Sequence, residues 1–193
     1  MVGVLALQGD FAAHEAALHR RGVPSRRVRR SQDLEGIAGL VLPGGESTTM
    51  LKLLQDGGME DALRGAVSGG LPVLATCAGV ILLAEEVTNP PQPSLGLLRV
   101  GVARNAYGRQ VASTVTRLVV TDRDELPVSE LEGVFIRAPR VVRVGEGVKV
   151  LAKRGEDPVL LRQGTILAAT FHPELSPHSP VLDLFLKLLG RDA

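Results

Sequence analysis

Apolar runs alternate with amphipathic stretches along the first half of the chain. Short apolar runs bounded by Gly or Pro are typical of strands buried on both faces of a parallel sheet. Strands are predicted at Val2–Leu7, Val23–Val28, Gly39–Leu42 and Leu71–Ala75. Helices are predicted after Asp10 as cap, with Gly22 just past the end, from Ser47 as cap to Leu54, and over Met59–Val67. This alternation predicts an α/β fold with a mostly parallel open sheet and helices on both faces, as in flavodoxin-like proteins.

The pattern changes after Asn89-Pro-Pro-Gln-Pro93, where dense proline indicates a loop. Closely spaced strand-like runs follow, at Val100–Arg104, Ser113–Val120, Gly133–Ile136, Val141–Val144, Val148–Ala152 and Val159–Leu161. Their spacing predicts antiparallel strands added to the sheet. Thr165–Phe171 is predicted to return to the core as a strand, and Ser179-Pro180 to open a last helix that ends at Gly190. We expect residues 1–193 to form a single domain.

Composition narrows the function classes. The chain has 193 residues, 45% of them hydrophobic, and a net charge of +1, which is ordinary for a soluble globular protein. Its single cysteine fits a reducing cytoplasm, and no apolar stretch is long enough for a membrane span. The first residues are apolar without a basic lead, so no signal peptide is expected. Only 3% of residues are aromatic, and the arginines between positions 20 and 30 are expected to be solvated, so nucleic acid is not the expected partner.

The lone Cys77 lies between a predicted buried strand and a predicted helix, with Ala78 and Gly79 in the turn. Burial in the core is the commoner fate of a free cysteine. The strand–turn–helix arrangement, however, is typical of a nucleophile elbow, in which the N–H of the next residue, Ala78, contributes to an oxyanion hole. The helix dipole would favour the thiolate.

A thiolate nucleophile needs a base and a group that orients the base. His14 and His19 fall on the first predicted helix, where surface placement is expected, and His178 falls in a loop. His172 instead follows a predicted strand, at the edge where active sites of open α/β sheets lie. Since alternate residues of an extended segment face the same side, Glu174 is predicted to orient His172.

Gly44 and Gly45 follow a predicted strand and precede a helix, so their backbone N–H groups can approach a ligand closely. Together with Ala78, Gly45 is a candidate oxyanion donor. The segment lacks the lysine of a phosphate-binding loop, and the scattered His residues and single Cys offer no metal-ligand spacing. No metal site is predicted.

Six blocks of the sequence together resemble a known family. They are Leu5-Ala-Leu-Gln-Gly-Asp-Phe11, Pro43-Gly-Gly-Glu-Ser-Thr-Thr49, Thr76-Cys-Ala-Gly79, Arg104-Asn-Ala-Tyr-Gly-Arg-Gln110, Phe135-Ile-Arg-Ala-Pro139 and Phe171-His-Pro-Glu-Leu175. The Cys, Pro-Gly-Gly and His-Pro-Glu blocks resemble class I (triad-type) glutamine amidotransferases. All six, in order, resemble the glutaminase subunit of pyridoxal 5'-phosphate synthase.

The resemblance implies hydrolysis of L-glutamine to L-glutamate and ammonia through a thioester on Cys77, with His172 as proton shuttle and Glu174 as its orienter. It assigns the oxyanion to Gly45 and Ala78, and glutamine binding to Gly45, Glu46, Ser47, Arg104, Ile136 and Arg137. Which arginine meets the glutamine carboxylate stays open. One departure is Ala75, where many amidotransferases have Gly; Ala would tolerate an unusual backbone conformation less well.

The family also implies a partner. Ammonia would pass to a (β/α)₈-barrel synthase subunit in a large hetero-oligomer whose assembly activates the glutaminase. Gln8 resembles the residue that senses this docking, although a buried Gln capping a turn would look the same. No cofactor is expected in this chain, and pyridoxal phosphate would be the product of the complex.

Three alternatives remain at this point. The chain could be a glutaminase that serves another synthase, since the triad would be identical. It could be a Cys-elbow hydrolase or redox chaperone on the same sheet architecture, which usually lacks the Pro-Gly-Gly and His-Pro-Glu pairing. A non-catalytic binding module that keeps the fold would have no need of an intact Cys77, His172 and Glu174.

Overall fold

Five parallel strands form one half of the main sheet. The computed structural model describes residues 1–106 and 113–190. The strands are β1 (Val2–Leu5), β2 (Ser25–Val28), β3 (Gly39–Leu42), β4 (Val73–Thr76) and β12 (Ile166–Ala169), arranged in the order β2-β1-β3-β4-β12. This is the flavodoxin-like strand order, in which ligands bind beyond the carboxyl ends of the strands. The predicted α/β class is confirmed.

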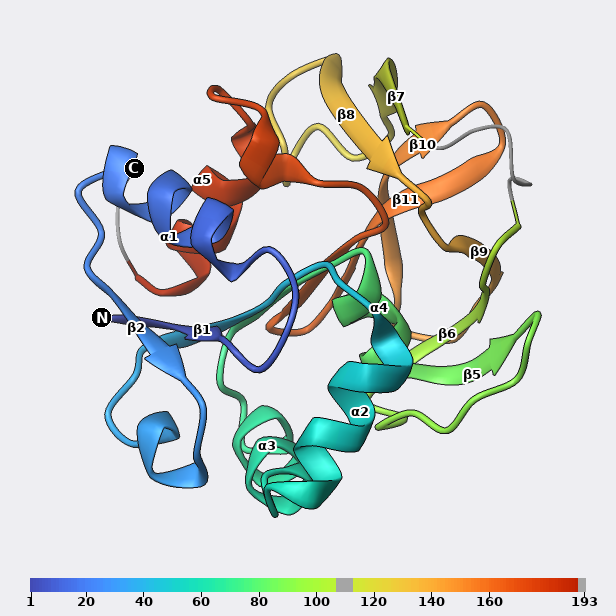
Figure 1. Cartoon of the computed structure of the whole chain (residues 1–193). Coiled ribbons are helices and arrows are strands. Elements are labelled where there is room, and N and C mark those ends of the chain that lie inside the picture. Colours follow the sequence, from blue (N-terminus) through green and yellow to red (C-terminus); the bar gives the residue numbers. More distant parts are fainter. Residues whose placement is uncertain (107–112, 191–193) are drawn as a thin grey trace.

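Helices cover both faces of these strands, as predicted (Figure 1). One face holds α1 (Phe11–Arg20) and α5 (Pro180–Leu188), and the other holds α2 (Ser47–Asp56), α3 (Glu60–Ser68) and α4 (Ala78–Leu83). Successive strand residues alternate between the two cores: Val41 packs with α1 and α5, whereas Leu40 and Leu42 pack with α2, α3 and α4. Both faces are apolar, which is why the strands are almost uniformly hydrophobic in sequence.

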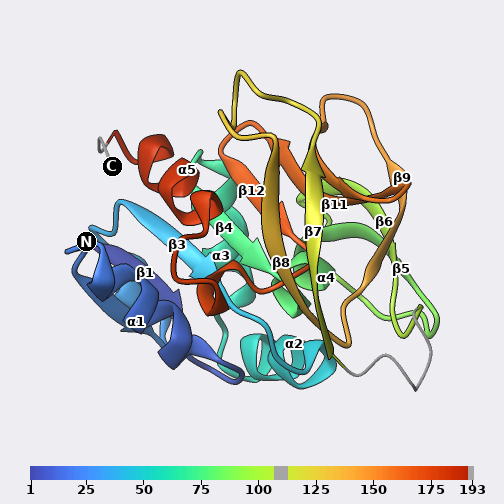
Figure 2. The same ribbon diagram turned by 90° about the horizontal axis from the view of Figure 1, so that it is seen from above.

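Beyond β12 the sheet continues with antiparallel strands, and a second small sheet lies beside it (Figure 2). The continuation is β11 (Asp157–Gln163), β10 (Lys149–Arg154), β7 (Ser113–Val120) and β8 (Glu130–Ile136), and the small sheet is β5 (Ala84–Thr88), β6 (Leu98–Ala103) and β9 (Arg140–Val144). The predicted antiparallel addition is confirmed for the first group. It is wrong for β6 and β9, which join a separate sheet, where β6 also pairs in parallel with the unpredicted β5.

Several predicted boundaries shift by a few residues. Strand β1 ends at Leu5, two residues early, and the strand predicted over Thr165–Phe171 is reduced to β12. The cap of α1 is Asp10, as predicted, since the Ala13 N–H donates to its carboxylate at 3.4 Å. The cap of α2 is Glu46 and not Ser47. A carboxylate with two oxygens satisfies more of the free N–H groups at a helix start than one hydroxyl can.

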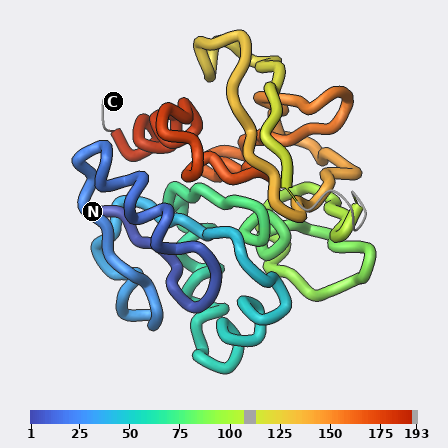
Figure 3. The backbone as a smooth tube through the Cα atoms, turned by 45° about the horizontal axis from the view of Figure 1, so that its top comes forward, coloured from blue at the N-terminus to red at the C-terminus, as the bar shows by residue number. Residues whose placement is uncertain are grey.

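The carboxyl ends of β3, β4 and β12 lie at the same edge of the sheet, because the three strands are parallel neighbours. Gly44, Cys77 and His172 follow these three strand ends and are brought together there. The N-terminus and the end of α5 lie on one side of the molecule, away from the small sheet (Figure 3). No helix in the described part of the chain is long and apolar enough to cross a membrane.

Candidate active site

Cys77 occupies a strained turn between β4 and α4. Its φ of 47° and ψ of −103° lie in a region that non-glycine residues rarely adopt. Such strain persists only where the surrounding fold imposes it, and it is concentrated at functional sites. Gly79 permits the turn, since an added Cβ there would overlap the Leu42 carbonyl oxygen. Ala75 lies within β4 with ordinary extended pairing, so the departure from Gly carries no backbone penalty.

His172 and Glu174 form the pair that the sequence predicted, but in a different local structure. His172 precedes the 3-10 turn η2 (Pro173–Leu175), so Glu174 lies in this turn and not in an extended segment. His172 Nδ1 lies 2.7 Å from Glu174 Oε1. An ionised carboxylate only accepts, so Nδ1 carries the proton and Nε2 is left for the Cys77 thiol. All three side chains are buried: Cys77 and His172 are 6% exposed and Glu174 is 4% exposed.

The electrostatics favour the charged forms of His172 and Glu174. Burial lowers the pKa of His172, but the hydrogen bond to Cys77 and the hydrogen bond and charge of Glu174 outweigh it and raise this pKa to about 10. Burial raises the pKa of Glu174, but the charge and hydrogen bonds of His14 and His172 lower it to about 2. Near neutral pH the pair is therefore an imidazolium bonded to a carboxylate.

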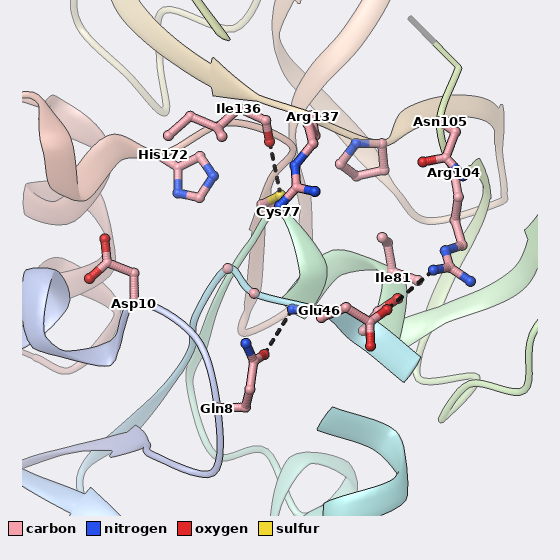
Figure 4. Close-up of a pocket in the computed structure, with 14 residues that line it drawn as sticks. Gln8, Asp10, Glu46, Cys77, Ile81, Arg104, Asn105, Ile136, Arg137 and His172 are labelled. Atoms are coloured by element: carbon pink, nitrogen blue, oxygen red, sulfur yellow. Dashed lines mark hydrogen bonds and ion pairs between the residues drawn. The ribbon is translucent and has the colours of Figure 1, made fainter. Parts of the chain in front are cut away.

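The glycine segment after β3 packs directly against this pair. An added Cβ on Gly44 would come within 2.5 Å of His172 Cε1 and 3.4 Å of Cys77 Cβ. An added Cβ on Gly45 would overlap Gln8 Oε1. The Glu46 N–H donates to the same Gln8 oxygen at 2.8 Å (Figure 4). Both glycines are thus required by close approach, and Gln8 contacts the segment predicted to supply an oxyanion donor.

Two arginines with different surroundings also line the pocket. Arg104 Nη2 lies 3.4 Å from Glu46 Oε1 and 3.3 Å from Thr48 Oγ1. The same carboxylate accepts from the Thr49 hydroxyl and N–H, each at 2.7 Å, and these bonds lower its pKa to about 2.

Arg137 directly follows β8 with a positive φ of 45°. Within residues 1–106 and 113–190 no hydrogen bond or ion pair engages its guanidinium, which lies near Cys77 (Figure 4). It is therefore the arginine available to a ligand.

A pocket of about 350 Å³ unites these groups. Its lining includes Gln8, Gly45, Glu46, Ser47, Cys77, Arg104, Ile136, Arg137 and His172 of the predicted site. The Ile136 carbonyl oxygen lies 3.8 Å from Cys77 Sγ. The hydroxyl of Ser47 donates its proton to Gln92 Oε1 at 2.9 Å, so this proton is not available to a ligand. Glu174 and Ala78 are not in the lining: Glu174 lies behind His172, and Ala78 is the buried first residue of α4, whose N–H has no acceptor within the helix.

The prediction of a surface position for His14 is wrong, since this side chain is 1% exposed and bonded to the triad. Its spacing from Ala17 and Leu18, at i+3 and i+4 on the buried face of α1, was the available signal. The sequence also missed Asp10, Ile81, Asn105 and Pro139 in the pocket lining. Three of these fall inside the family-like blocks, and Ile81 lies one helical turn after Cys77. The segment Tyr107–Gln110 of one block lies outside the described residues.

Among the described residues no cluster of three or more His, Cys, Asp or Glu has the arrangement of a metal site. The pocket instead holds a nucleophile and a base, Cys77 and His172, together with the Arg137 guanidinium, and the Glu174 carboxylate orients the base from behind. This set can carry out acyl transfer on a small substrate with an anionic end.

The chain is similar to named proteins over nearly its full length. The chain is 53% identical to the pyridoxal 5'-phosphate synthase subunit PdxT of Koribacter versatilis, over 97% of this chain and 95% of that protein. It is 50% identical to the PdxT subunit of Thermus thermophilus over 98% of both chains. A crystal structure of a glutamine amidotransferase superposes with a TM-score of 0.90 at 49% identity, covering 98% of this chain and 99% of the other.

A more distant structure shares the fold alone. The structure of PurLQS from Thermotoga maritima superposes with a TM-score of 0.75 at 16% identity, over 97% of both chains. Residues 4–190 match the SNO glutamine amidotransferase family, and the chain belongs to that family.

Proposed function

We propose that this chain is the glutaminase subunit of a pyridoxal 5'-phosphate synthase, and that it hydrolyses L-glutamine to L-glutamate and ammonia. The observation that carries the proposal is Cys77 in a strained elbow, beside the bonded His172–Glu174 pair and facing Arg137. Subunits of the same name, PdxT, are 53% and 50% identical to this chain over nearly its full length, which supports this synthase over another.

The first chemical step is attack on the side-chain amide of glutamine. The Cys77 thiolate adds to the amide carbon, and the carbonyl oxygen becomes an oxyanion held by the N–H groups of Gly45 and Ala78. Loss of one such donor typically costs about 10²–10³ in rate. His172 Nε2–H then protonates the amide nitrogen, the C–N bond breaks, and ammonia leaves behind a thioester.

The second step regenerates the enzyme. Neutral His172 takes a proton from water as the water attacks the thioester carbonyl. The C–S bond breaks, glutamate is released and Cys77 returns as thiolate beside the imidazolium. Glu174 keeps His172 in one tautomer through both steps, as its 2.7 Å bond to Nδ1 supports.

Recognition of the amino-acid end of glutamine falls to the arginines that line the pocket. The guanidinium of Arg137, which no group in the described structure engages, suits the α-carboxylate of glutamine. Arg104 is already paired with Glu46, so it stabilises the Glu46 side of the pocket and contributes charge at longer range. Gly45, Glu46, Ser47 and Ile136 complete the substrate contacts, with backbone groups as well as side chains.

A partner synthase subunit receives the ammonia in this proposal, as a (β/α)₈ barrel in a large hetero-oligomer. Gln8 lies between the first strand and the Gly45–Glu46 peptide, where a small displacement would change the oxyanion site. This position supports its role as the residue that senses docking.

The test is glutamate release from L-glutamine, measured with and without the synthase subunit of a PdxT-containing complex. We expect release to require Cys77 and to rise strongly when the synthase is present. Release that is independent of Cys77, or absent with the synthase at any concentration, would overturn the proposal. Faster turnover of esters or peptides than of glutamine would favour a general Cys hydrolase instead.

A further inference from the structure

A second buried histidine contacts the triad from behind. His14 lies in the second turn of α1 and is 1% exposed. Its Nε2 lies 3.3 Å from Glu174 Oε1 and 3.0 Å from Thr76 Oγ1. Thr76 directly precedes Cys77 in the chain, so a single imidazole contacts both the orienting carboxylate and the residue next to the nucleophile.

The hydrogen bonds fix where the proton of His14 lies. Glu174 is ionised, because its pKa is lowered to about 2 despite burial that raises it, so its oxygens only accept. An unprotonated Nε2 would face this carboxylate with its lone pair and repel it. His14 Nε2 therefore carries a hydrogen, shared between the Glu174 carboxylate and the Thr76 hydroxyl.

The Glu174 carboxylate has few other hydrogen-bond partners in the described structure. Glu174 Oε1 accepts from both His172 Nδ1 and His14 Nε2, whereas Glu174 Oε2 is buried with no hydrogen-bond partner in the described structure. Without His14, the hydrogen bond to His172 would be the only one that orients the carboxylate within the described part of the chain. A buried charge with a single partner is poorly compensated and free to turn.

We infer that His14 is a positioning residue of the triad, which holds the Glu174 carboxylate toward His172 and links it to the strand end that carries Cys77. This inference deepens the proposed glutaminase function and rests on it. His14 does not line the pocket, so it acts on the reaction only through Glu174 and Thr76.

The role predicts a specific change in pH dependence. The titratable and charged groups around Glu174 are His172, His14 and Arg20, and Arg20 donates to the Glu174 backbone oxygen at 3.2 Å. Strand β8 contributes Glu132, which accepts from Ser176. Loss of the His14 contact removes one of the two donors that keep the carboxylate ionised. The acid limb of glutaminase activity should then move to higher pH.

The decisive experiment compares His14→Asn with His14→Gln in the complex with the synthase subunit. The Gln amide can reach the position of imidazole Nε2, whereas the shorter Asn amide cannot. We expect His14→Asn to lower kcat by about 10-fold to 100-fold, less than the ~10⁴ that loss of an orienting carboxylate costs. Its KM should be unchanged, and its acid limb should shift upward by about one pH unit. His14→Gln should stay within about threefold of the parent.

The outcomes separate the two proposals. His19→Gln is the matched control, because His19 is an exposed histidine on the same helix. If the parent chain releases no glutamate with the synthase, the proposed function fails. If the parent is active and both His14 variants match it, the positioning role fails. Equal losses in both variants, with a lowered Tm and an unmoved acid limb, would show that His14 is only a packing residue and would also overturn the inference.

Discussion

The two halves of the molecule contribute different parts of the site. The parallel half supplies Gly44, Cys77 and His172, which follow β3, β4 and β12. The antiparallel half and the small sheet supply Arg104 and Arg137, which directly follow β6 and β8. The triad residues Cys77, His172 and Glu174 are buried, whereas Arg137 is exposed and Arg104 is partly exposed.

This difference separates chemistry from recognition. Low exposure strengthens the electrostatic coupling of Cys77, His172 and Glu174, since little water screens them. Arg104 and Arg137 must instead meet a substrate that arrives from water, so they keep solvent access. Changes to the triad should therefore lower kcat, and changes to the two arginines should raise KM.

The largest effect is expected for Cys77→Ala. Removal of the nucleophile should lower glutamate release by at least about 10⁴-fold, because no other side chain in the pocket can form the thioester. Release is measured in the presence of the synthase subunit, and an unchanged Tm serves as the folding control. Residual activity above about one per cent of the parent would contradict the assignment.

A smaller loss is expected for Glu174→Gln on the same side of the pocket. The amide keeps the size of the side chain but cannot stabilise the imidazolium, so kcat should fall by about 10³-fold to 10⁴-fold with KM nearly unchanged. Steady-state kinetics of glutamate release check this. A change confined to KM would contradict the assignment of Glu174 to the chemical step.

The contribution of ionised Glu174 should also be measurable from the stability of the fold at acid pH, without an activity assay. The folded pKa of Glu174, about 2, lies below the ordinary value of 4.5. Its stabilising contribution is therefore full above about pH 4.5 and is lost as the pH falls toward 2, by roughly 3 kcal/mol. Urea unfolding of the parent between pH 6 and 2 should show this loss, and Glu174→Gln should lack it.

The control for this measurement is Glu156→Gln, the same change at a carboxylate that is 98% exposed. It should keep the acid slope of the parent. Equal slopes for the parent and both variants would show that Glu174 carries no such contribution.

The smallest effect is expected on the antiparallel side. Arg137→Ala should raise KM for glutamine by about 10-fold to 100-fold and leave kcat within a few-fold, since a charged hydrogen bond to the substrate is lost. Arg104→Ala should raise KM less, because its guanidinium is already paired with Glu46. The reverse ranking would assign the glutamine carboxylate to Arg104.

The parallel half was the more predictable of the two. Its strands are buried on both faces, so apolar runs with Gly boundaries mark them directly, and Gly39–Leu42 was predicted without error. The small sheet was not predicted, because β5 contains two exposed glutamates and β6 pairs with β9, which lies far along the chain. Local patterns do not encode such pairing.

Within the site, residue types were easier to predict than their surroundings. The His172–Glu174 contact was predicted from an extended segment and is made in a 3-10 turn, because Pro173 favours the start of a helical turn. The chemistry of histidine and the polar neighbours of His14 favoured a surface position. Its burial depends on Glu174, which lies 160 residues away and offers a partner that no local pattern reveals.

Because Cys77 is the single cysteine, the fraction of molecules with a reactive thiol can be measured directly. Every thiol reagent that adds to the chain adds at position 77, since no other cysteine competes. Intact-mass measurement after brief exposure to a small alkylating agent therefore gives the fraction of molecules with an accessible, ionised thiol. The same labelling, repeated after a partner is added, shows how the partner changes the fraction of chains with a reactive Cys77 thiol. It needs no engineered probe.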